Sequence, residues 1–82
     1  MDLYKTKAVT GIRAVSYNGT NGDEIRAFLG DGNVIENGGD FQVHLSDGRW
    51  ETLHPGWQAT LTPGGERLAF SPKAFATWLE RE

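Results

Sequence analysis

The sequence predicts an α+β fold, with a bent antiparallel sheet of five or six strands, barrel-like and partly open, packed with two short helices. Apolar and polar residues alternate with a period of two through much of the second half of the chain. Clusters of Gly, Asn, Asp and Pro separate these segments, and two short segments carry apolar residues at helical spacing. Because 82 residues suffice for one core, we expect a single domain over residues 1–82.

The first strand is expected over residues 5–17, where β-branched and aromatic side chains are frequent. Gly11 interrupts this stretch and suggests a bulge or a bend. A cluster of turn-forming residues at positions 18–22 ends the strand.

A short helix should follow, because Asn21 with Glu24 three residues later has the spacing of a helix-capping signal. One face of this helix carries Ile25, Phe28 and Leu29. Gly30 ends the helix, a short strand is expected over residues 33–36, and residues 37–40 form a second turn.

The clearest strands form two hairpins. Apolar residues alternate with polar ones over residues 41–45, and the chain returns over residues 50–53. Between them, Asp47-Gly48 offers the positive φ angles of a type I′ turn. A second hairpin joins residues 57–62 to residues 66–70 through a Pro-Gly-Gly turn. Together these segments predict a meander of four strands.

A second helix closes the chain, with Ser71 as its N-cap and Pro72 in its first turn. Its apolar stripe consists of Ala74, Phe75, Trp78 and Leu79. We expect both helices to cover the apolar side of the sheet. The predicted core comprises Val9, Ile12, Phe28, Leu29, Phe41, Val43, Leu45, Leu61, Leu68, Phe70, Phe75 and Leu79.

Composition narrows the classes of function. The net charge of -3, with both signs interspersed, argues against a sequence-independent nucleic-acid binder. There is no cysteine, and no apolar run approaches the roughly 20 residues of a membrane helix. We therefore expect a soluble cytoplasmic protein without a membrane partner. A chain this short buries only about 60% of its unfolded surface, so we also expect a homo-oligomer.

Catalytic and metal-binding patterns are weak. His44, Asp47 and His54 are the residues that could begin a metal or acid-base site, but each lies where an exposed or hydrogen-bonded side chain is the usual finding. The serines lack a nucleophile motif, and the Gly-rich segments lack the lysine and hydroxyl of a phosphate-binding loop. We predict no enzyme activity, no metal and no cofactor.

Aromatic and arginine residues form the more informative set. Trp50 lies beside Arg49 after a hairpin tip, where an indole and a guanidinium can stack on a purine or contact a partner. The predicted ligand- or partner-binding residues are Arg49, Trp50, Trp57, Gln58, Arg13 and Arg67, and Arg26 could add to this surface. In the alternative interpretation, Trp57 and Trp78 belong to the core and Trp50 covers a sheet edge.

The C-terminal half carries a familiar pattern. Pro55-Gly56, Gly65-Glu66, Pro72 and Phe75 match the signature P-G-D-[WY]-[IV], then G-E, then P-x-x-F. In this respect the chain resembles a family of small bacteriophage proteins. The first half fits the family outline more loosely, through Lys7, Val9, Tyr17, Glu24, Phe28 and Gly30. The chain departs from the signature after Pro-Gly, where Trp57 and Gln58 displace the aromatic residue by one position and thus to the other sheet face.

The resemblance implies an accessory role in counter-defence against the host, and two hypotheses follow. In the first, a homo-oligomer sequesters a nucleotide messenger of bacterial immunity, with aromatic rings stacking on bases and cations meeting phosphates. In the second, the domain is an inhibitor that binds a host defence enzyme or nuclease through an acidic or aromatic face.

Overall fold

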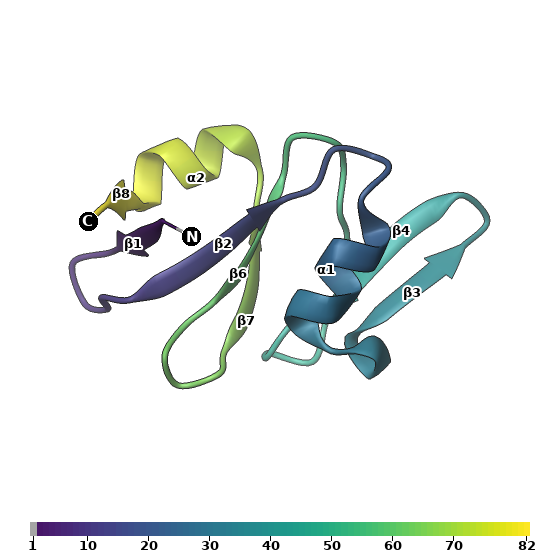
Figure 1. Ribbon diagram of the computed structural model, residues 1–82, viewed down its shortest axis with the longest axis horizontal. Helices are drawn as coiled ribbons and strands as arrows, with labels where there is room; N and C mark the ends of the chain where they lie inside the picture. The colour runs from purple at the N-terminus through teal and green to yellow at the C-terminus, as the bar shows by residue number, and fades with distance from the viewer. Residues whose placement is uncertain (1) are drawn as a thin grey trace.

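The chain forms two antiparallel sheets and two short α-helices (Figure 1). The structure is a computed structural model and describes residues 2–82. The elements are β1 (Leu3–Lys5), β2 (Ile12–Ser16), α1 (Gly22–Leu29), the 3-10 helix η1 (Asp31–Asn33), β3 (Val34–Asn37), β4 (Asp40–His44), β5 (Trp50–Thr52), β6 (Gln58–Leu61), β7 (Arg67–Phe70), α2 (Pro72–Trp78) and β8 (Glu80–Arg81). One sheet has the order β7-β6-β2-β1-β8 and the other has the order β3-β4-β5. The α+β class is therefore confirmed, although the strands do not close into a barrel.

The segment predicted as one long first strand is a pair of strands. β1 and β2 lie antiparallel, with Tyr4 opposite Ile12, so the continuous strand over residues 5–17 is wrong. The chain reverses through residues 6–11, where the Thr6 N–H donates to the Val9 carbonyl at 2.8 Å. This reversal leaves the other edge of β1 free to pair with β8, which brings the two ends of the chain together (Figure 1).

The two predicted hairpins are present, but the turn type at the first is different. In the loop between β4 and β5, the Gly48 N–H donates to the Leu45 carbonyl at 3.0 Å, and the Leu45 N–H donates to the Arg49 carbonyl at 2.8 Å. Gly48 has a φ of 92°, whereas Asp47 does not have a positive φ. The predicted type I′ turn is therefore wrong, because the loop has three residues and ends in a glycine bulge. The turn of residues 62–66 repeats the same pair of bonds.

The predicted meander of four strands breaks between its second and third strands. β6 pairs with β2 on one side and with β7 on the other, not with β5. The crossing is fixed by Tyr17, whose carbonyl accepts the Gly56 N–H at 2.7 Å and whose N–H donates to the Trp57 carbonyl at 2.8 Å. These bonds extend the β2–β6 pairing beyond the end of β2, so the chain enters the other sheet between β2 and β7.

The larger core lies between the two sheets. The register places Val15, Ala59 and Ala69 side by side on one face of the five-stranded sheet. The buried residues that pack with this face are Tyr17, Ile25, Leu29, Val34, Phe41, Val43, Leu45 and Leu53. Helix α1 contributes two of them and lies between β2 and the three-stranded sheet (Figure 1). The apolar face of α1 explains this position, because the helix buries that face by packing against both β2 and the three-stranded sheet.

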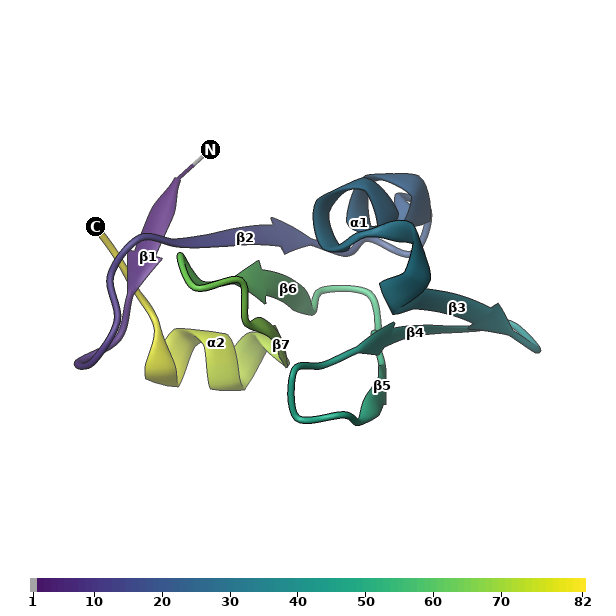
Figure 2. The same cartoon turned by 90° about the horizontal axis from the view of Figure 1, so that it is seen from below.

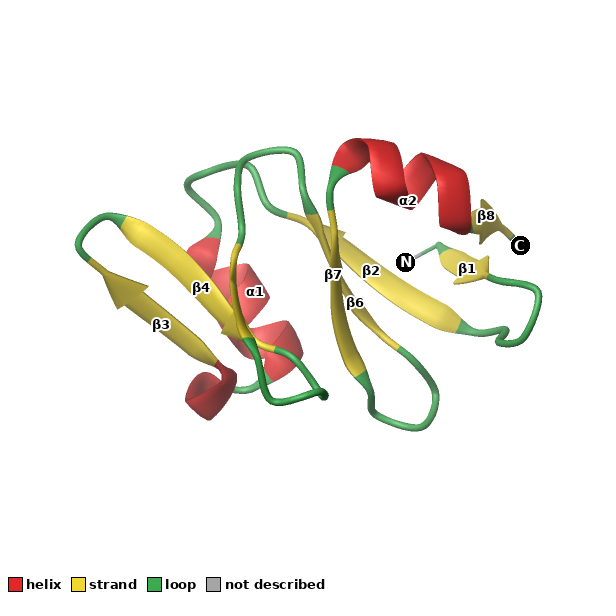
Figure 3. Cartoon of the chain, turned by 180° about the vertical axis from the view of Figure 1, so that it is seen from behind, coloured by secondary structure: helices red, strands yellow, loops and turns green. Residues whose placement is uncertain are grey.

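Helix α2 packs on the opposite face of the same sheet. Its Phe75 ring meets Tyr4 edge-on at 4.9 Å and Phe70 at 6.4 Å between ring centroids. Tyr4 pairs with Ile12, which points away from the face of Val15 because side chains alternate along β2. Figures 2 and 3 show α2 and α1 on different sides of β2, β6 and β7. The expectation that both helices cover one side of the sheet is therefore wrong.

Burial matches the predicted core in part. The fully buried members are Ile12, Leu29, Phe41, Val43, Leu45 and Leu79, while Phe28, Leu61, Val9, Phe70 and Phe75 are partly buried. Leu68 is exposed, because it lies on the edge strand β7 where α2 does not cover it. Trp78 is 67% exposed, so the interpretation that placed it in the core is wrong.

The two helix starts differ in how they are fixed. The Ser71 hydroxyl accepts the Ala74 N–H at 3.2 Å, which confirms the predicted N-cap of α2. At α1, the Asn21 amide instead donates to the Glu24 carboxylate at 2.7 Å and to the Ser16 carbonyl at 2.8 Å. Asn21 and Glu24 thus connect the start of α1 to the end of β2, and the Asn21 side chain does not cap the helix as predicted. Neither helix in residues 2–82 has the length and apolar character needed to cross a bilayer.

Gly22 should be sensitive to substitution. A Cβ at this position would lie 2.7 Å from Phe41 Cε2, and this buried ring is stacked on Tyr17 at 4.7 Å, so it has little room to move. We expect Gly22→Ala to lower the free energy of unfolding by about 1–3 kcal/mol, measured by urea denaturation. Gly32→Ala is the matched control, because nothing lies within 4 Å of the added methyl group. Equal stability of the two variants would contradict the packing described for Phe41.

Candidate functional site

The outer face of the three-stranded sheet is the first candidate site. Val34 and Val43 pair on the inner face and are buried, so the alternate residues point outward. This outer face consists of Ile35, Gln42, His44, Trp50 and Thr52, in cross-strand rows that pair Ile35 with Gln42, Gln42 with Thr52, and His44 with Trp50. Its centre therefore carries no acidic or permanently cationic side chain, while charged residues stand at its ends, at Asp40 and at the Asp47–Arg49 turn. We refer to these five residues as the outer face.

Trp50 is held in place by its cross-strand neighbour. The rings of His44 and Trp50 stack with centroids 4.8 Å apart and an interplanar angle of 26°. Trp50 remains 39% exposed, and Ile35 on the opposite edge strand is 43% exposed. A stacked aromatic pair contributes about 0.5–1.5 kcal/mol beyond its buried area, which limits the rotamers of the indole. The result is a large apolar side chain that is exposed but pre-organised.

Arg49 is bound within its own turn. Its Nε donates to Asp47 Oδ2 at 2.7 Å, and its backbone N–H donates to Asp47 Oδ1 at 3.0 Å. The backbone hydrogen bond, followed by the guanidinium bond, lowers the pKa of Asp47 below its ordinary value of 3.8. The same carboxylate raises the pKa of Arg49. The positive charge at the hairpin tip is thus largely offset by its neighbour.

Arg67 joins the two sheets instead of facing a ligand. Its Nε donates to the His44 carbonyl at 2.8 Å, and its backbone N–H donates to the Ser46 hydroxyl at 2.7 Å. The Ser46 N–H returns a bond to the Arg67 carbonyl at 3.1 Å. These three bonds attach the β4–β5 hairpin to the start of β7. Arg67 therefore holds the backbone of the strand that carries His44 and does not itself belong to the outer face.

The remaining predicted site residues lie elsewhere. Arg13 in β2 places its guanidinium carbon 5.6 Å from the centre of the Phe28 ring. Trp57 packs against the larger core, with His54 at 5.3 Å, and Gln58 points to the face on which α2 lies. Three of the six predicted residues, Arg49, Trp50 and Arg67, therefore come together at the β4–β5 hairpin. Arg13, Trp57 and Gln58 do not join that group, and Gln58 lies on the opposite face of the five-stranded sheet from Arg13.

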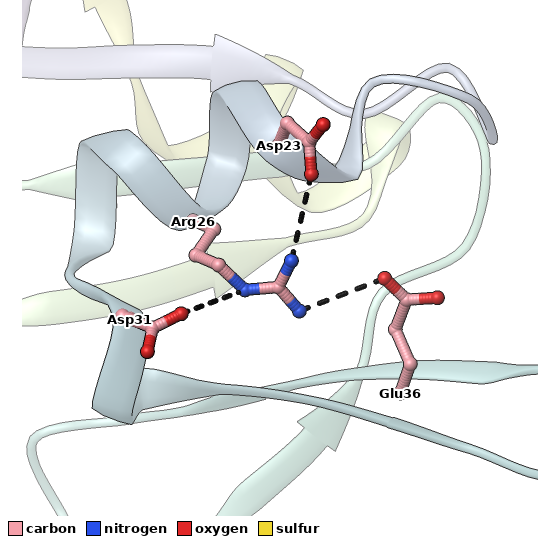
Figure 4. A network of polar contacts seen from close by, with 4 residues as sticks. All are labelled: Asp23, Arg26, Asp31 and Glu36. Carbon is pink, nitrogen blue, oxygen red and sulfur yellow. Dashed lines mark ion pairs between the residues drawn. The ribbon is translucent and has the colours of Figure 1, made fainter.

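Arg26 is engaged by carboxylates rather than free to bind a ligand. Figure 4 shows its guanidinium among Asp23, Asp31 and Glu36, at 3.5, 3.1 and 3.6 Å. These partners come from α1, η1 and β3, so the cluster links the helix to the edge of the three-stranded sheet. Asp23 lies three residues before Arg26 on α1, a spacing that favours ion pairs on helices.

The histidines that could have begun a metal site have other contacts. His44 stacks on Trp50 and His54 packs on Trp57. Within residues 2–82, no three His, Cys, Asp or Glu side chains are grouped closely enough to hold a metal ion.

Two functional features were missed from the sequence. His44 was considered only as a possible ligand, yet the period of two over residues 41–45 places it outward, and a hairpin register then pairs it with Trp50. Ile35 gave no signal, because its strand is short and the sheet to which it belongs was not foreseen. Comparisons of the chain with protein-family models, curated proteins and solved structures gave no match.

The Asp47–Arg49 contact should be visible in an acid titration. Because the folded pKa of Asp47 lies below 3.8, its contribution to stability is present above 3.8 and is lost as the pH falls through the folded value. We expect NMR titration of the Asp47 carboxyl to give a pKa below 3.8. In Arg49→Gln the pKa should rise only in part, since the backbone N–H of residue 49 still donates. A full return to 3.8 in this variant would show that the guanidinium, not the backbone, is the main cause.

Proposed function

We propose that this chain is a non-enzymatic binding domain that docks a partner protein through the outer face. The observation that carries the proposal is the exposed Trp50 on edge strand β5, stacked on His44 at 4.8 Å, in an outer face whose five residues include no acidic or permanently cationic side chain. Centres of protein interfaces are depleted in charge and enriched in aromatic residues, and tryptophan is frequent among the residues that dominate binding energy.

The surroundings of Trp50 favour a protein over a phosphate-bearing ligand at this face. Arg49 is paired with Asp47, and Arg67 is bonded to the His44 carbonyl, so both nearby guanidinium groups already have acceptors. A phosphate would have to compete with the Asp47 carboxylate for Arg49 and would find the Nε of Arg67 already engaged. A protein partner instead gains from the apolar centre and from the polar rim formed by the Asp47–Arg49 turn.

The resemblance to small phage proteins gives this binding a biological setting. We propose that the partner is a host defence enzyme or nuclease and that the domain inhibits it by occupying its surface. No reaction is assigned to the chain. The alternative, a homo-oligomer that sequesters a nucleotide, needs an open aromatic ring and free cations in one place. The outer face does not combine these groups.

The outer face can be tested by site-specific cross-linking. A photoreactive residue at Thr52 should capture a distinct host protein from a bacterial lysate, and one at Thr77 on α2 should not. The captured protein is then purified and its affinity for the domain is measured. We expect Trp50→Ala to weaken binding by about 30-fold or more, as for a dominant interface residue.

Trp78→Ala is the matched control, because this tryptophan is also exposed but lies on α2, away from the outer face. Its affinity for the captured protein should equal that of the unmodified chain. If Trp50→Ala binds as tightly as the control, the outer face is not the docking surface.

A further inference from the structure

A groove is lined by residues of β1, the β1–β2 connection, the end of α2 and β8. These elements lie at the end of the molecule where both termini meet, remote from β3, β4 and β5 (Figure 1). The volume of the groove is about 830 Å³, within the range of sites for small molecules. One wall is the connection between β1 and β2, and the other is the end of α2 with the start of β8. The lining residues are Lys5, Thr6, Lys7, Ala8, Thr10, Thr77, Trp78 and Glu80.

Trp78 gives the groove an open aromatic surface. It is the last residue of α2 and 67% exposed, the largest exposed fraction among the big apolar side chains of the described chain. Its neighbours in the helical stripe are used differently, since Phe75 packs on Tyr4 and Leu79 is buried. A single exposed tryptophan is not unusual by itself. This one, however, lies in a hollow that also contains cations.

The two lysines of the groove are free to meet an anion. Within residues 2–82, neither Lys5 nor Lys7 forms an ion pair, whereas Arg26, Arg49 and Arg81 all do. Glu80 lies opposite Lys5 in the β1–β8 pair and also lines the groove, so the lining has a net charge of +1. The Thr10 hydroxyl adds a polar group without a hydrogen-bond partner in the described part of the chain.

We propose that this groove binds a nucleoside monophosphate, with the base stacked on Trp78 and the phosphate beside Lys5 and Lys7. Stacking on an aromatic side chain suits any base, because every base has a π-face. A phosphate monoester carries a charge of about -1.5 to -2 at pH 7, which the two lysines can meet, and the Glu80 carboxylate disfavours a polyphosphate. A nucleic-acid strand is also disfavoured, since two lysines cannot follow a charged backbone and the chain as a whole carries -3. This site goes beyond the proposed docking function and does not depend on it.

The test is a titration of the full chain with adenosine monophosphate, followed by NMR of the three indole N–H groups. We expect the Trp78 signal and the amide of Lys7 to shift, while the signals of Trp50 and Trp57 stay in place. Adenosine and inorganic phosphate, added alone, should each bind about tenfold more weakly or worse, because each makes only one of the two contacts. Guanosine and uridine monophosphates should bind within about tenfold of the adenosine compound.

Substitutions identify the two contacts separately. Trp78→Ala and Lys7→Ala should each weaken binding of adenosine monophosphate by about tenfold. Both residues are exposed, so the variants should retain the fold, which their NMR spectra will verify. Trp50→Ala is the control and should bind the nucleotide normally, so failure here is distinguishable from failure of the docking function.

Three results would overturn the proposal. The first is an unmoved Trp78 signal at millimolar nucleotide. The second is equal affinity for adenosine and its monophosphate, which would remove the role of the lysines. The third is a short acidic peptide that binds the groove more tightly than any of the nucleotides, which would make it a peptide site.

Discussion

Strand β6 is the constraint on which the rest of the structure depends, because it is buried on both faces. Ala59 and Thr60 are neighbours that point to opposite sides, and both are fully inaccessible. The small Ala59 lets α1 and the three-stranded sheet approach one face, while Thr60 lies on the face where α2 packs. The Thr60 hydroxyl donates to the Leu68 carbonyl at 3.2 Å, so its burial leaves no polar atom unsatisfied. A central strand of this kind divides the apolar residues of a small chain into two cores, one against α1 and the three-stranded sheet and one against α2. The two ends of the molecule therefore present different surfaces.

Local features of the fold could be predicted from the sequence, and non-local ones could not. The hairpins over residues 41–53 and 57–70 and the Ser71 cap depend on residues a few positions apart, so their signals survive in the sequence. The pairing of β1 with β8 and of β2 with β6 depends on segments far apart, for which the sequence offers no register. For the same reason, the crossing at Tyr17 was invisible: it uses backbone groups only, whatever the side chains around Gly56 and Trp57.

The candidate sites show the same division. The turn signal of Asp47-Gly48 places Trp50 directly after a hairpin tip, where the structure has it 39% exposed, and its pairing with His44 follows from the hairpin register. Trp78 was assigned to a core stripe, since it lies three residues after Phe75. Periodicity could not reveal that α2 ends at Trp78 and that Leu79, outside the helix, turns inward. Arg13 and Arg67 were grouped with the hairpin by residue type alone, yet one lies over Phe28 and the other bonds a carbonyl.

Charge separates the two ends of the molecule further. Of the residues from Asp23 to Asp40, five are acidic and only Arg26 is basic, so the end with α1 and β3 is strongly negative. Strand β1 and the end of α2, whose residues line the groove, lie at the opposite end of the longest axis (Figure 1). An anionic ligand is therefore repelled from one end and met by free lysines at the other, an effect that acts over about 10 Å at ordinary ionic strength. Because the outer face and the groove share no residue and belong to different sheets, a protein bound at the outer face and a small anion in the groove would not compete for the same residues.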